Sequence, residues 1–386
     1  MLLRRARTGL AGPAIGILTL SLIACGGTAA EDAPPGANTV VVSVDPASAA
    51  IEIGDSLPIT ATVTGSALSG VTWSVTEGAA GGSVSEAGVY TAPVAAGTYH
   101  VVARSIADPA RSAQAVVTVT DSSWVDVTAY GARGDGVADD TTAFRAAAAT
   151  RKNVRVPKPS AFYRISGNVR LYGSLQGDGS MPEIRMFGAN GTEGMSMFSV
   201  LDYTGPGLVI RGVRLNGQWD GRGTSGEWSH NILVKGSSNI TIEDNVLERP
   251  YGDNILLGGE NNPAPSRNVV IRRNQLLDPR RCNVALISSR NVVISDNVIK
   301  KSNDYVTAID LEPNPSPHDS VWDTEITGNT FDSPNAVAVQ LYHFDYGYPT
   351  DGLAGGDVTI TGNTGRWMRF FAQVGNWVNV VQSGNG

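Results

Sequence analysis

Two stretches with different patterns of hydrophobic and polar positions divide the chain. Between residues 38 and 121, short segments of alternating apolar and polar residues, among them SLPITATVTG and GTYHVVARS, are separated by turn residues at intervals of roughly ten positions. The alternation has the period of strands with one buried face. It predicts a small β-sandwich, with Trp73 in its core and His100 in a structural role within a strand.

The second pattern is a repeat that is clearest from residue 239 onward. Five segments share one order of apolar and polar positions: NITIEDNVL, NVVIRRNQL, NVVISDNVI, DTEITGNTF and DVTITGNTG. The repeated asparagines are Asn245, Asn274, Asn297, Asn329 and Asn363. Because their spacing is unequal while the core pattern is constant, the repeat indicates the rungs of a solenoid that carry loops of different length.

Within each rung, the apolar positions predict an inward stack. The predicted inward residues are Ile242, Ile271, Ile294, Ile326 and Ile360 before the repeated asparagine, and Leu247, Leu276, Ile299 and Phe331 after it. Asparagine tolerates the left-handed backbone conformation, so we expect the repeated asparagines to make the bend between two strands. We also expect their stacked side chains to hydrogen-bond along the solenoid, which is a structural role.

A further strand follows each bend, and its inward residues align the rungs. The aligned segments are HNILVK, DNILLG, CNVALI, TAIDLE and VAVQLY. One outward column reads Leu233, Leu256, Ala285, Asp310 and Gln340, and the other reads Lys235, Gly258, Ile287, Glu312 and Tyr342. Two carboxylates therefore share the outer face of one strand. The apolar outward residues on earlier rungs indicate that a loop or a ligand covers part of this sheet.

The segment from Trp124 to Thr150 reads as a strand, a Gly- and Asp-rich turn that accounts for the tripeptide RGD, and a short helix that Asp139 or Asp140 can cap. Together with the following NVRVPKPSAFYRISGNVRLYGSLQGDG, it resembles the start of the pectate lyase-like right-handed parallel β-helix proteins, which include rhamnogalacturonases. The resemblance implies an all-β solenoid over residues 124–386, a helix over its N-terminal end and an extracellular polysaccharide as substrate. Residues 38–121 resemble bacterial Ig-like domains of the BIG2 type.

Asp310 and Glu312 are the first candidates for catalysis. Alternate residues on a strand have Cα atoms roughly 6.5–7 Å apart, and inverting glycosidases hold their two carboxyl groups about 6.5–9.5 Å apart. The spacing is compatible with inversion, and a solvated strand face is the alternative explanation. His230, Asp253 and Arg281 lie just before aligned strands and are further catalytic candidates for a hydrolase, a lyase or an epimerase.

Other residues are candidates for holding the polysaccharide, because aromatic faces suit the apolar faces of sugar rings and polar groups suit their hydroxyls and carboxylates. These residues are Lys235, Trp219, Trp228, Asp304, Tyr305, Gln340, Tyr342 and His343. A lyase or an epimerase would need a cation to stabilise the charge that develops beside a uronate carboxylate. Ca²⁺ bound by carboxylates of these rungs is one alternative, and the sequence identifies no certain cofactor and no definite metal ligand.

The resemblance stops short of a catalytic set. The paired aspartates and GHG motif of polygalacturonases are absent, and Asn254 stands in YGDNI where a second aspartate would be expected. The DPH motif of alginate epimerases is absent too. The fold and the substrate class therefore carry over from the resemblance, whereas the reaction does not.

The N-terminus reads as a targeting segment. Three arginines within the first seven residues precede the apolar run LAGPAIGILTLSLIA, which is too short for an ordinary membrane-spanning helix. The run ends in LIAC, which resembles a bacterial lipobox and implies cleavage before Cys25 and lipidation of its thiol. We expect a signal peptide over residues 1–24 and a flexible linker over 25–37. Cys282 then has no partner for an internal disulfide and is expected to be a buried structural thiol.

The composition limits the classes of molecule that the protein is expected to bind. The chain has 29 Lys and Arg against 36 Asp and Glu, a formal net charge of −7, and no basic stripe that would favour nucleic acid. The sequence predicts a lipid-anchored, extracytoplasmic protein of the bacterial cell envelope, monomeric, whose partner is a polysaccharide that is expected to be acidic. Two functions stay open: a lyase, hydrolase or epimerase, or a non-catalytic polysaccharide-binding or adhesion protein on the same scaffold.

Overall fold

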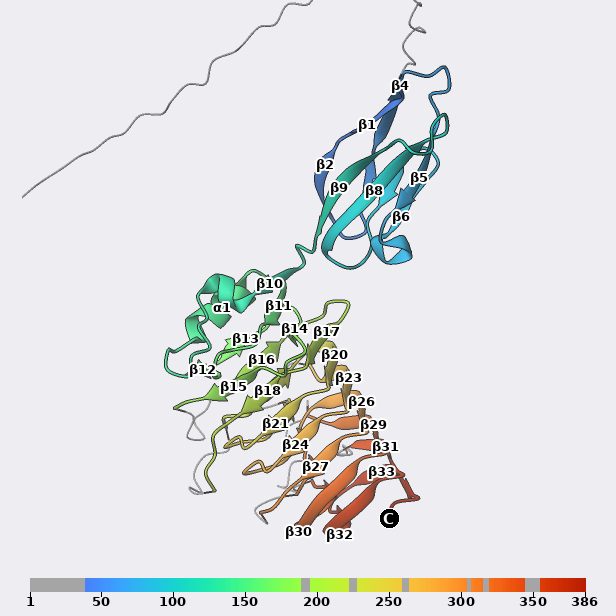
Figure 1. The fold of residues 1–386 in the computed structure, drawn as a ribbon. Coiled ribbons are helices and arrows are strands. Elements are labelled where there is room, and N and C mark those ends of the chain that lie inside the picture. Colours follow the sequence, from blue (N-terminus) through green and yellow to red (C-terminus); the bar gives the residue numbers. More distant parts are fainter. Residues whose placement is uncertain are drawn as a thin grey trace, which may run out of the picture. The chain divides into compact units, whose positions relative to one another are not determined.

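Strands make up most of the architecture (Figure 1). The structure, a computed structural model, describes residues 39–188, 195–221, 228–258, 264–303, 307–314, 319–343 and 355–386. The chain divides into two compact units, Met1–Thr120 and Asp121–Gly386. Each unit has a hydrophobic core of its own.

The first unit contains three sheets around one core. A four-stranded sheet has the order β2-β9-β8-β5, and β1-β4 and β3-β7-β6 form two smaller sheets. The elements are β1 (Val41–Asp45), β2 (Ser48–Glu52), β3 (Ser56–Pro58), β4 (Thr60–Thr64), β5 (Val71–Val75), the 3₁₀ helix η1 (Gly78–Gly81), β6 (Ser83–Val84), β7 (Val89–Thr91), β8 (Gly97–Ser105) and β9 (Ser112–Thr120). Trp73 packs against this core, and His100 Nδ1 lies 2.6 Å from Glu77 Oε1. The arrangement agrees with the small β-sandwich predicted from the alternation.

The second unit begins with β10 (Trp124–Asp126), the 3₁₀ helix η2 (Val127–Tyr130) and the helix α1 (Thr141–Ala149). α1 buries Phe144, whose ring meets that of Tyr163 edge to face with centroids 5.3 Å apart. Asp139 Oδ1 accepts a hydrogen bond from the Thr141 N–H at 3.0 Å, whereas the Asp140 carboxylate holds the preceding turn. Of the two predicted capping residues, Asp139 therefore serves the helix.

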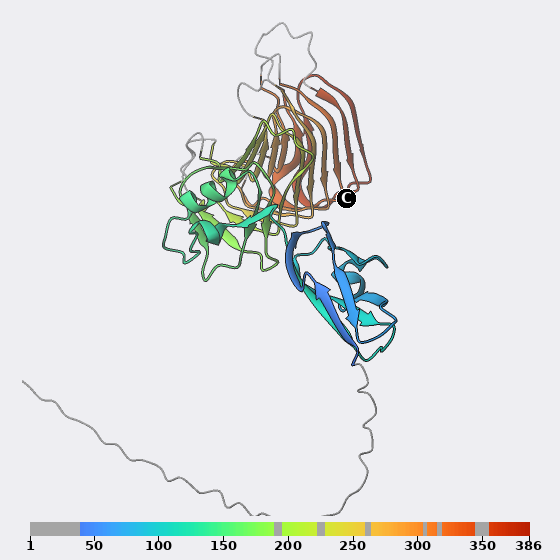
Figure 2. The same ribbon diagram turned by 90° about the horizontal axis from the view of Figure 1, so that it is seen from above.

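Ten parallel strands form the first long sheet of this unit. They are, in order, β10, β11 (Asn153–Val156), β14 (Leu175–Gly177), β17 (Leu208–Arg211), β20 (Ser238–Glu243), β23 (Ser266–Arg272), β26 (Ser289–Ser295), β29 (Val321–Thr327), β31 (Gly355–Thr361) and β33 (Trp377–Ser383). Successive strands of the sheet come from successive turns of the chain, and Figure 2 shows them side by side.

The other long sheet contains two parallel ladders that the strand β30 (Thr330–Leu341) joins. One ladder is β12 (Tyr163–Ile165), β15 (Glu183–Met186), β18 (Arg214–Asn216), β21 (Val246–Glu248), β24 (Gln275–Leu277), β27 (Val298–Lys300) and β30, with β32 (Thr364–Gln373) beside β30. The other ladder is β13 (Val169–Arg170), β16 (Phe198–Leu201), β19 (Ile232–Lys235), β22 (Ile255–Leu257), β25 (Val284–Leu286), β28 (Ile309–Leu311) and again β30. Each full turn thus contributes three strands to a parallel β-helix, as the sequence predicted.

The predicted inward stacks are confirmed. Ile242, Ile271 and Ile294 are directly paired from rung to rung and fully buried, and the ladder continues through Ile326 and Ile360. The second predicted stack, which runs from Leu247 to Phe331 on the next face, is also in register and buried. Burial of apolar side chains along the whole axis is the main stabilising contribution to such a solenoid.

The repeated asparagines form a continuous ladder of hydrogen bonds, as predicted. The side-chain amide of each donates to Oδ1 of the next at 2.9–3.1 Å, and Asn385 extends the ladder by one rung. The predicted backbone conformation is wrong. The left-handed residue is the one before each asparagine, for example Asp244 (φ 55°), Arg273 (φ 54°) and Gly328 (φ 64°). The asparagine itself bonds neighbouring backbone groups across the bend.

Candidate functional site

The outward columns that the sequence predicted lie on β19, β22, β25, β28 and β30 with the predicted register. Leu233, Leu256, Ala285, Asp310 and Gln340 are paired one after another. Asp310 alternates with Ile309 and Leu311, which are fully buried in the core. Asp310 is nevertheless only 2 % exposed, while Glu312 is half-buried. A solvated strand face, the alternative explanation for the two acids, is therefore wrong for Asp310.

Three further polar side chains stand in a column beside these acids. His230, Asp253 and Cys282 each lie two residues before the first paired residue of their strand. His230 Nδ1 lies 3.1 Å from Asp253 Oδ2 and accepts a hydrogen bond from the Asp253 N–H at 3.0 Å. The other carboxylate oxygen of Asp253 accepts from the Cys282 N–H at 2.8 Å. Cys282 Sγ in turn lies 3.8 Å from Asp310 Oδ2.

The geometry therefore unites five polar side chains in one buried outer-face cluster, consisting of His230, Asp253, Arg281, Cys282 and Asp310, with Glu312 at its edge. Arg281 Nη1 lies 3.9 Å from Asp253 Oδ2. The ring nitrogen Nε2 of His230 is buried and has no hydrogen-bond partner within the part of the chain that the structure describes. Leu256 and Ala285 pack with Cys282 and complete the surroundings of the cluster.

The surroundings of the cluster shift the pKa values of its two aspartates in opposite directions. Burial alone would raise the pKa of the Asp253 carboxyl, but the Arg281 guanidinium and the His230 ring hold it below its ordinary value. Burial raises the pKa of Asp310 well above its ordinary value, and the charges of Glu312 and Asp253 add to that effect against the opposing charge of Arg281. The cluster therefore combines one carboxyl group whose partners favour the ionised form with another whose surroundings favour the neutral form.

Burial also raises the pKa of the Cys282 thiol well above its ordinary value, and the charges of Asp310 and Asp253 add to it. A neutral, buried thiol is a poor nucleophile. The prediction that Cys282 is a buried structural residue is confirmed as far as its position is concerned, because its side chain is fully buried and forms no disulfide.

Lys301 holds the turn that presents Arg281 and Cys282, and the sequence analysis missed it. The side chain is fully buried. Its ammonium donates to the carbonyl oxygen of Arg281, lies 3.5 Å from that of Arg280, and bonds Asn303 Oδ1 at 2.8 Å. Two adjacent lysines after a strand usually mark a solvated surface, so the sequence carried no signal of this burial.

A second asparagine ladder was also missed. Asn231 donates to Asn254 at 2.8 Å and Asn254 to Asn283 at 2.9 Å, one rung after another. The sequence does contain a signal for this ladder, because each of its asparagines stands at the same position of the aligned segments, directly after His230, Asp253 or Cys282. The ladder fixes the backbone on which the outer-face cluster stands. Asn254, which marked a departure from the polygalacturonase pattern, therefore has a structural place.

The remaining predicted site residues are spread along the same face. Trp228 meets the His230 ring edge to face at 6.1 Å, and Gln340 is directly paired with Asp310. Lys235 stands three rungs from Glu312, about 14 Å along the axis, and so is no immediate partner of the acids. Tyr342 and His343 follow β30 and are half-buried, as is Trp219 in the loop after β18. Asp304, Tyr305 and Cys25 lie outside the described residues.

Neither a metal centre nor a membrane span is found in the described ranges. They contain no group of three or more His, Cys, Asp or Glu side chains that could hold a metal ion. They also contain no helix that is long and apolar enough to cross a membrane. The Ca²⁺ alternative therefore receives no support from the arrangement of the outer-face cluster.

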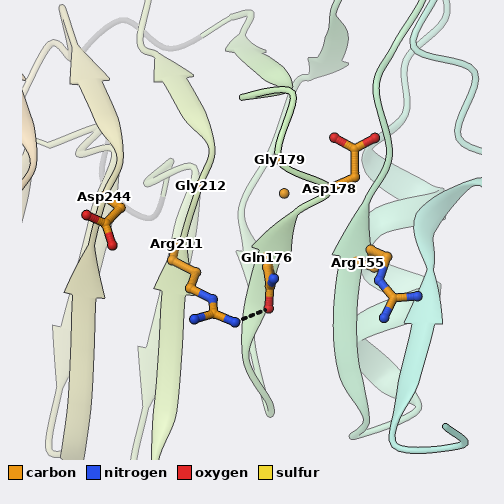
Figure 3. Close-up of a pocket in the computed structure, with 8 residues that line it drawn as sticks. Arg155, Gln176, Asp178, Gly179, Arg211, Gly212 and Asp244 are labelled. Atoms are coloured by element: carbon orange, nitrogen blue, oxygen red, sulfur yellow. Dashed lines mark hydrogen bonds between the residues drawn. The ribbon is translucent and has the colours of Figure 1, made fainter. Parts of the chain in front are cut away.

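Two open depressions lie away from the cluster, on the ten-stranded sheet. The larger, of about 470 Å³, spans β11, β14 and β17 (Figure 3), and the smaller, of about 300 Å³, spans β26, β29 and β31. Neither contains a residue predicted to be catalytic. These two depressions and the perturbed acids thus lie in different places, and the candidate site for a reaction is the acids, because a reaction needs groups that exchange protons.

Part of the chain is similar to a known protein family. The family described as "Periplasmic copper-binding protein (NosD)" matches residues 202–351, which is less than half of the chain. No curated protein matches. Among solved structures, the N-terminal fragment of bacteriophage Phi29 gene product 12 is 19% identical, with a TM-score of 0.46, over 62% of this chain and 47% of its own.

Two further solved structures have enzymatic descriptions. The tailspike protein gp49 of Acinetobacter baumannii bacteriophage Fri1, a capsular polysaccharide depolymerase, is 14% identical with a TM-score of 0.45, over 84% of this chain and 65% of that one. The A-module of the Azotobacter vinelandii mannuronan C-5 epimerase AlgE4 is 16% identical with a TM-score of 0.34, over 68% of this chain and 96% of that one. The chain thus spans about half to two thirds of the phage proteins, and over residues 202–351 it is similar to the NosD family.

Proposed function

We propose that the protein cleaves a glycosidic bond in an extracytoplasmic polysaccharide, with Asp310 as general acid and Glu312 as general base. The observation that carries the proposal is the buried carboxyl of Asp310, whose surroundings raise its pKa well above the ordinary value, directly beside a second carboxylate on the outer face of a β-helix. Pairs of titratable groups whose environments separate their pKa values mark acid and base roles.

The chain's own residues supply each part of this reaction. Asp310 would donate its proton to the oxygen of the leaving group, while Glu312 would take a proton from a water on the opposite face of the sugar. The Cα atoms of alternate strand residues are roughly 6.5–7 Å apart. In this structure a hydrogen bond joins the Asp310 and Glu312 side chains, so the pair would have to separate to the about 6.5–9.5 Å that inverting enzymes require for that water. Arg281, held near Asp253, would orient a uronate carboxylate of the substrate. An elimination or an epimerisation at the same groups would use Glu312 as the base.

The location is part of the proposal. The basic and apolar N-terminal segment with LIAC supports export and a lipid anchor at Cys25, on the surface or in the periplasm. The word "periplasmic" in the description of the matching family agrees with an extracytoplasmic place. The copper binding in that description is not carried over, because the described residues lack a suitable ligand cluster. The Ig-like resemblance of the first unit supports a role as spacer.

Non-catalytic glycan binding is the second candidate, and one observation favours it. Asp253, His230 and Asp310 are at most 2 % exposed, so the outer-face cluster also fits a purely structural network. In that case the half-buried residues at its edge, among them Glu312 and Tyr342, would contact a bound polysaccharide without turnover.

A panel of acidic and neutral polysaccharides, with and without calcium, tests the proposal. New reducing ends indicate hydrolysis, absorbance at about 235 nm indicates an elimination product, and changed sugar stereochemistry by NMR indicates epimerisation. We expect wild-type protein to release reducing ends, and Asp310→Asn and Glu312→Gln to slow the release by about 100-fold or more. Glu325→Gln, an exposed glutamate on β29, is the matched control and should retain full activity. Binding without any product from wild-type protein would sink the enzymatic proposal and leave the second candidate.

A further inference from the structure

The larger depression on the ten-stranded sheet has the size of a ligand site and lies apart from the outer-face cluster. Its volume of about 470 Å³ falls within the range of ordinary ligand pockets, which is about 300–1,000 Å³. Arg155, Gln176 and Arg211 are paired one after another on β11, β14 and β17, and all three line it. The side-chain amide of Gln176 therefore lies between the two arginines, whose strands are two rungs, or roughly 10 Å, apart along the axis. Figure 3 shows them around the hollow.

The positive charge of Arg211 faces this depression with a neutral partner. Its guanidinium donates to Gln176 Oε1 at 2.9 Å, and it makes no ion pair within 4 Å among the described residues. Its neighbour in register, Glu243, already accepts from Arg272 and Arg273, at 2.8 Å each. Arg155 has only a weak ion pair, 4.0 Å from Asp126.

The two acids that line the depression are already occupied. Asp178 accepts from the Ser180 hydroxyl and N–H and from the Lys158 N–H, at 2.5–3.0 Å. Both oxygens of Asp244 accept from Arg273, at 2.9 Å each, and that side-chain hydrogen bond holds the pKa of Asp244 below its ordinary value. Asp178 keeps its negative charge, because its donors are neutral, whereas Asp244 is balanced by Arg273. Two arginines therefore face one uncompensated acid in the lining of the depression.

Backbone forms part of the surface between the two arginines. A Cβ on Gly177 would lie 2.0 Å from the carbonyl oxygen of Gly212, so no side chain fits at this crossing. At this crossing the floor of the depression is consequently backbone, which leaves room for a sugar ring to lie against the peptide groups.

We propose that this depression is a second binding site, one for a negatively charged sugar residue, in which Arg155 and Arg211 hold the carboxylate and Gln176 a hydroxyl. Charge-assisted hydrogen bonds from arginine to a carboxylate are directional and strong enough to fix a ring in one orientation. The site is on another sheet from Asp310 and Glu312. It would hold an acidic polymer on the solenoid independently of any turnover.

Calorimetric titration of the full chain with oligogalacturonate, oligomannuronate and oligoglucuronate tests the site, in the Asp310→Asn background so that no probe is consumed. We expect at least one uronate to bind, and the double variant Arg155→Gln/Arg211→Gln to weaken it by about tenfold to hundredfold. The methyl ester of the same oligosaccharide should bind as weakly to the parent as the acid does to the double variant. Acetate should not compete at equal concentration.

The matched control is Arg290→Gln. Arg290 is exposed on the same sheet, lies 4.0 Å from Asp323 and stands over the Trp322 ring, much as Arg155 stands over Trp124. Its loss should leave the affinity unchanged. Unaltered affinity in the double variant, an equal loss with Arg290→Gln, or no uronate binding to the parent would each overturn the second site. None of these results bears on the release of reducing ends, so the two proposals fail separately.

Discussion

The asparagine ladder makes the most direct quantitative prediction, through the substitution Asn297→Ala. Asn297 is 1 % exposed and lies in the middle of the ladder. Its Oδ1 accepts from the backbone N–H and the side-chain amide of Asn274, at 2.9 and 3.1 Å. Its own amide donates to the Ile271 carbonyl and to Asn329 Oδ1, both at 2.9 Å. Alanine removes all four bonds and replaces none of them.

The expected loss follows from that count. A hydrogen bond contributes a net stabilisation of about 1 kcal/mol, and a buried group left without a partner costs about 1–3 kcal/mol. Four bonds to buried partners therefore predict a loss of about 4 kcal/mol in the free energy of unfolding. That is a large part of the about 5–15 kcal/mol that holds an ordinary domain folded.

Urea unfolding of the full chain, followed by circular dichroism, measures this loss. The control is Asn335→Ala, because Asn335 is exposed and its amide makes one hydrogen bond, to the Ser302 carbonyl at 2.9 Å. It should cost less than about 1 kcal/mol. If Asn297→Ala costs no more than Asn335→Ala, the ladder does not stabilise the solenoid and the reasoning is refuted.

Two further substitutions probe the outer-face cluster. Lys301→Met should lower the free energy of unfolding by about 3 kcal/mol, because the carbonyls of Arg280 and Arg281 lose a buried donor. Urea unfolding measures this loss. A change under about 1 kcal/mol would contradict the role of Lys301 in holding the turn. The pKa of Asp310 is raised in the folded protein by burial and by the charges of Glu312 and Asp253. The folded state therefore keeps a proton that the unfolded chain loses above about pH 4, and the contribution of Asp310 to stability falls as the pH rises. Asp310→Asn should consequently gain stability relative to wild type as the pH rises above about 4, and a difference that does not vary with pH would count against a raised pKa at Asp310.

The register of the solenoid could be predicted because each rung repeats one local pattern. The isoleucines from Ile242 to Ile360 and the outward column from Leu233 to Gln340 were aligned from sequence alone, and both alignments are confirmed. Alternation with a period of two decides which side chains enter the core, and a slip by one residue would expose all of them. Asp310 and Glu312 could therefore be assigned to the outer face without any knowledge of their surroundings.

Contacts between rungs depend on segments that are more than 20 residues apart and on loops of unequal length, which the local pattern does not encode. Only the tertiary structure shows that His230, Asp253 and Cys282 form a chain of contacts to Asp310. It likewise assigns the left-handed conformation to the residue before each ladder asparagine, because the asparagine side chain must reach the next rung. The sequence by itself determined which residues face in and which face out, since that follows from strand periodicity. Only the tertiary structure shows which outward acid is removed from water and has its pKa raised, since desolvation depends on everything packed around it.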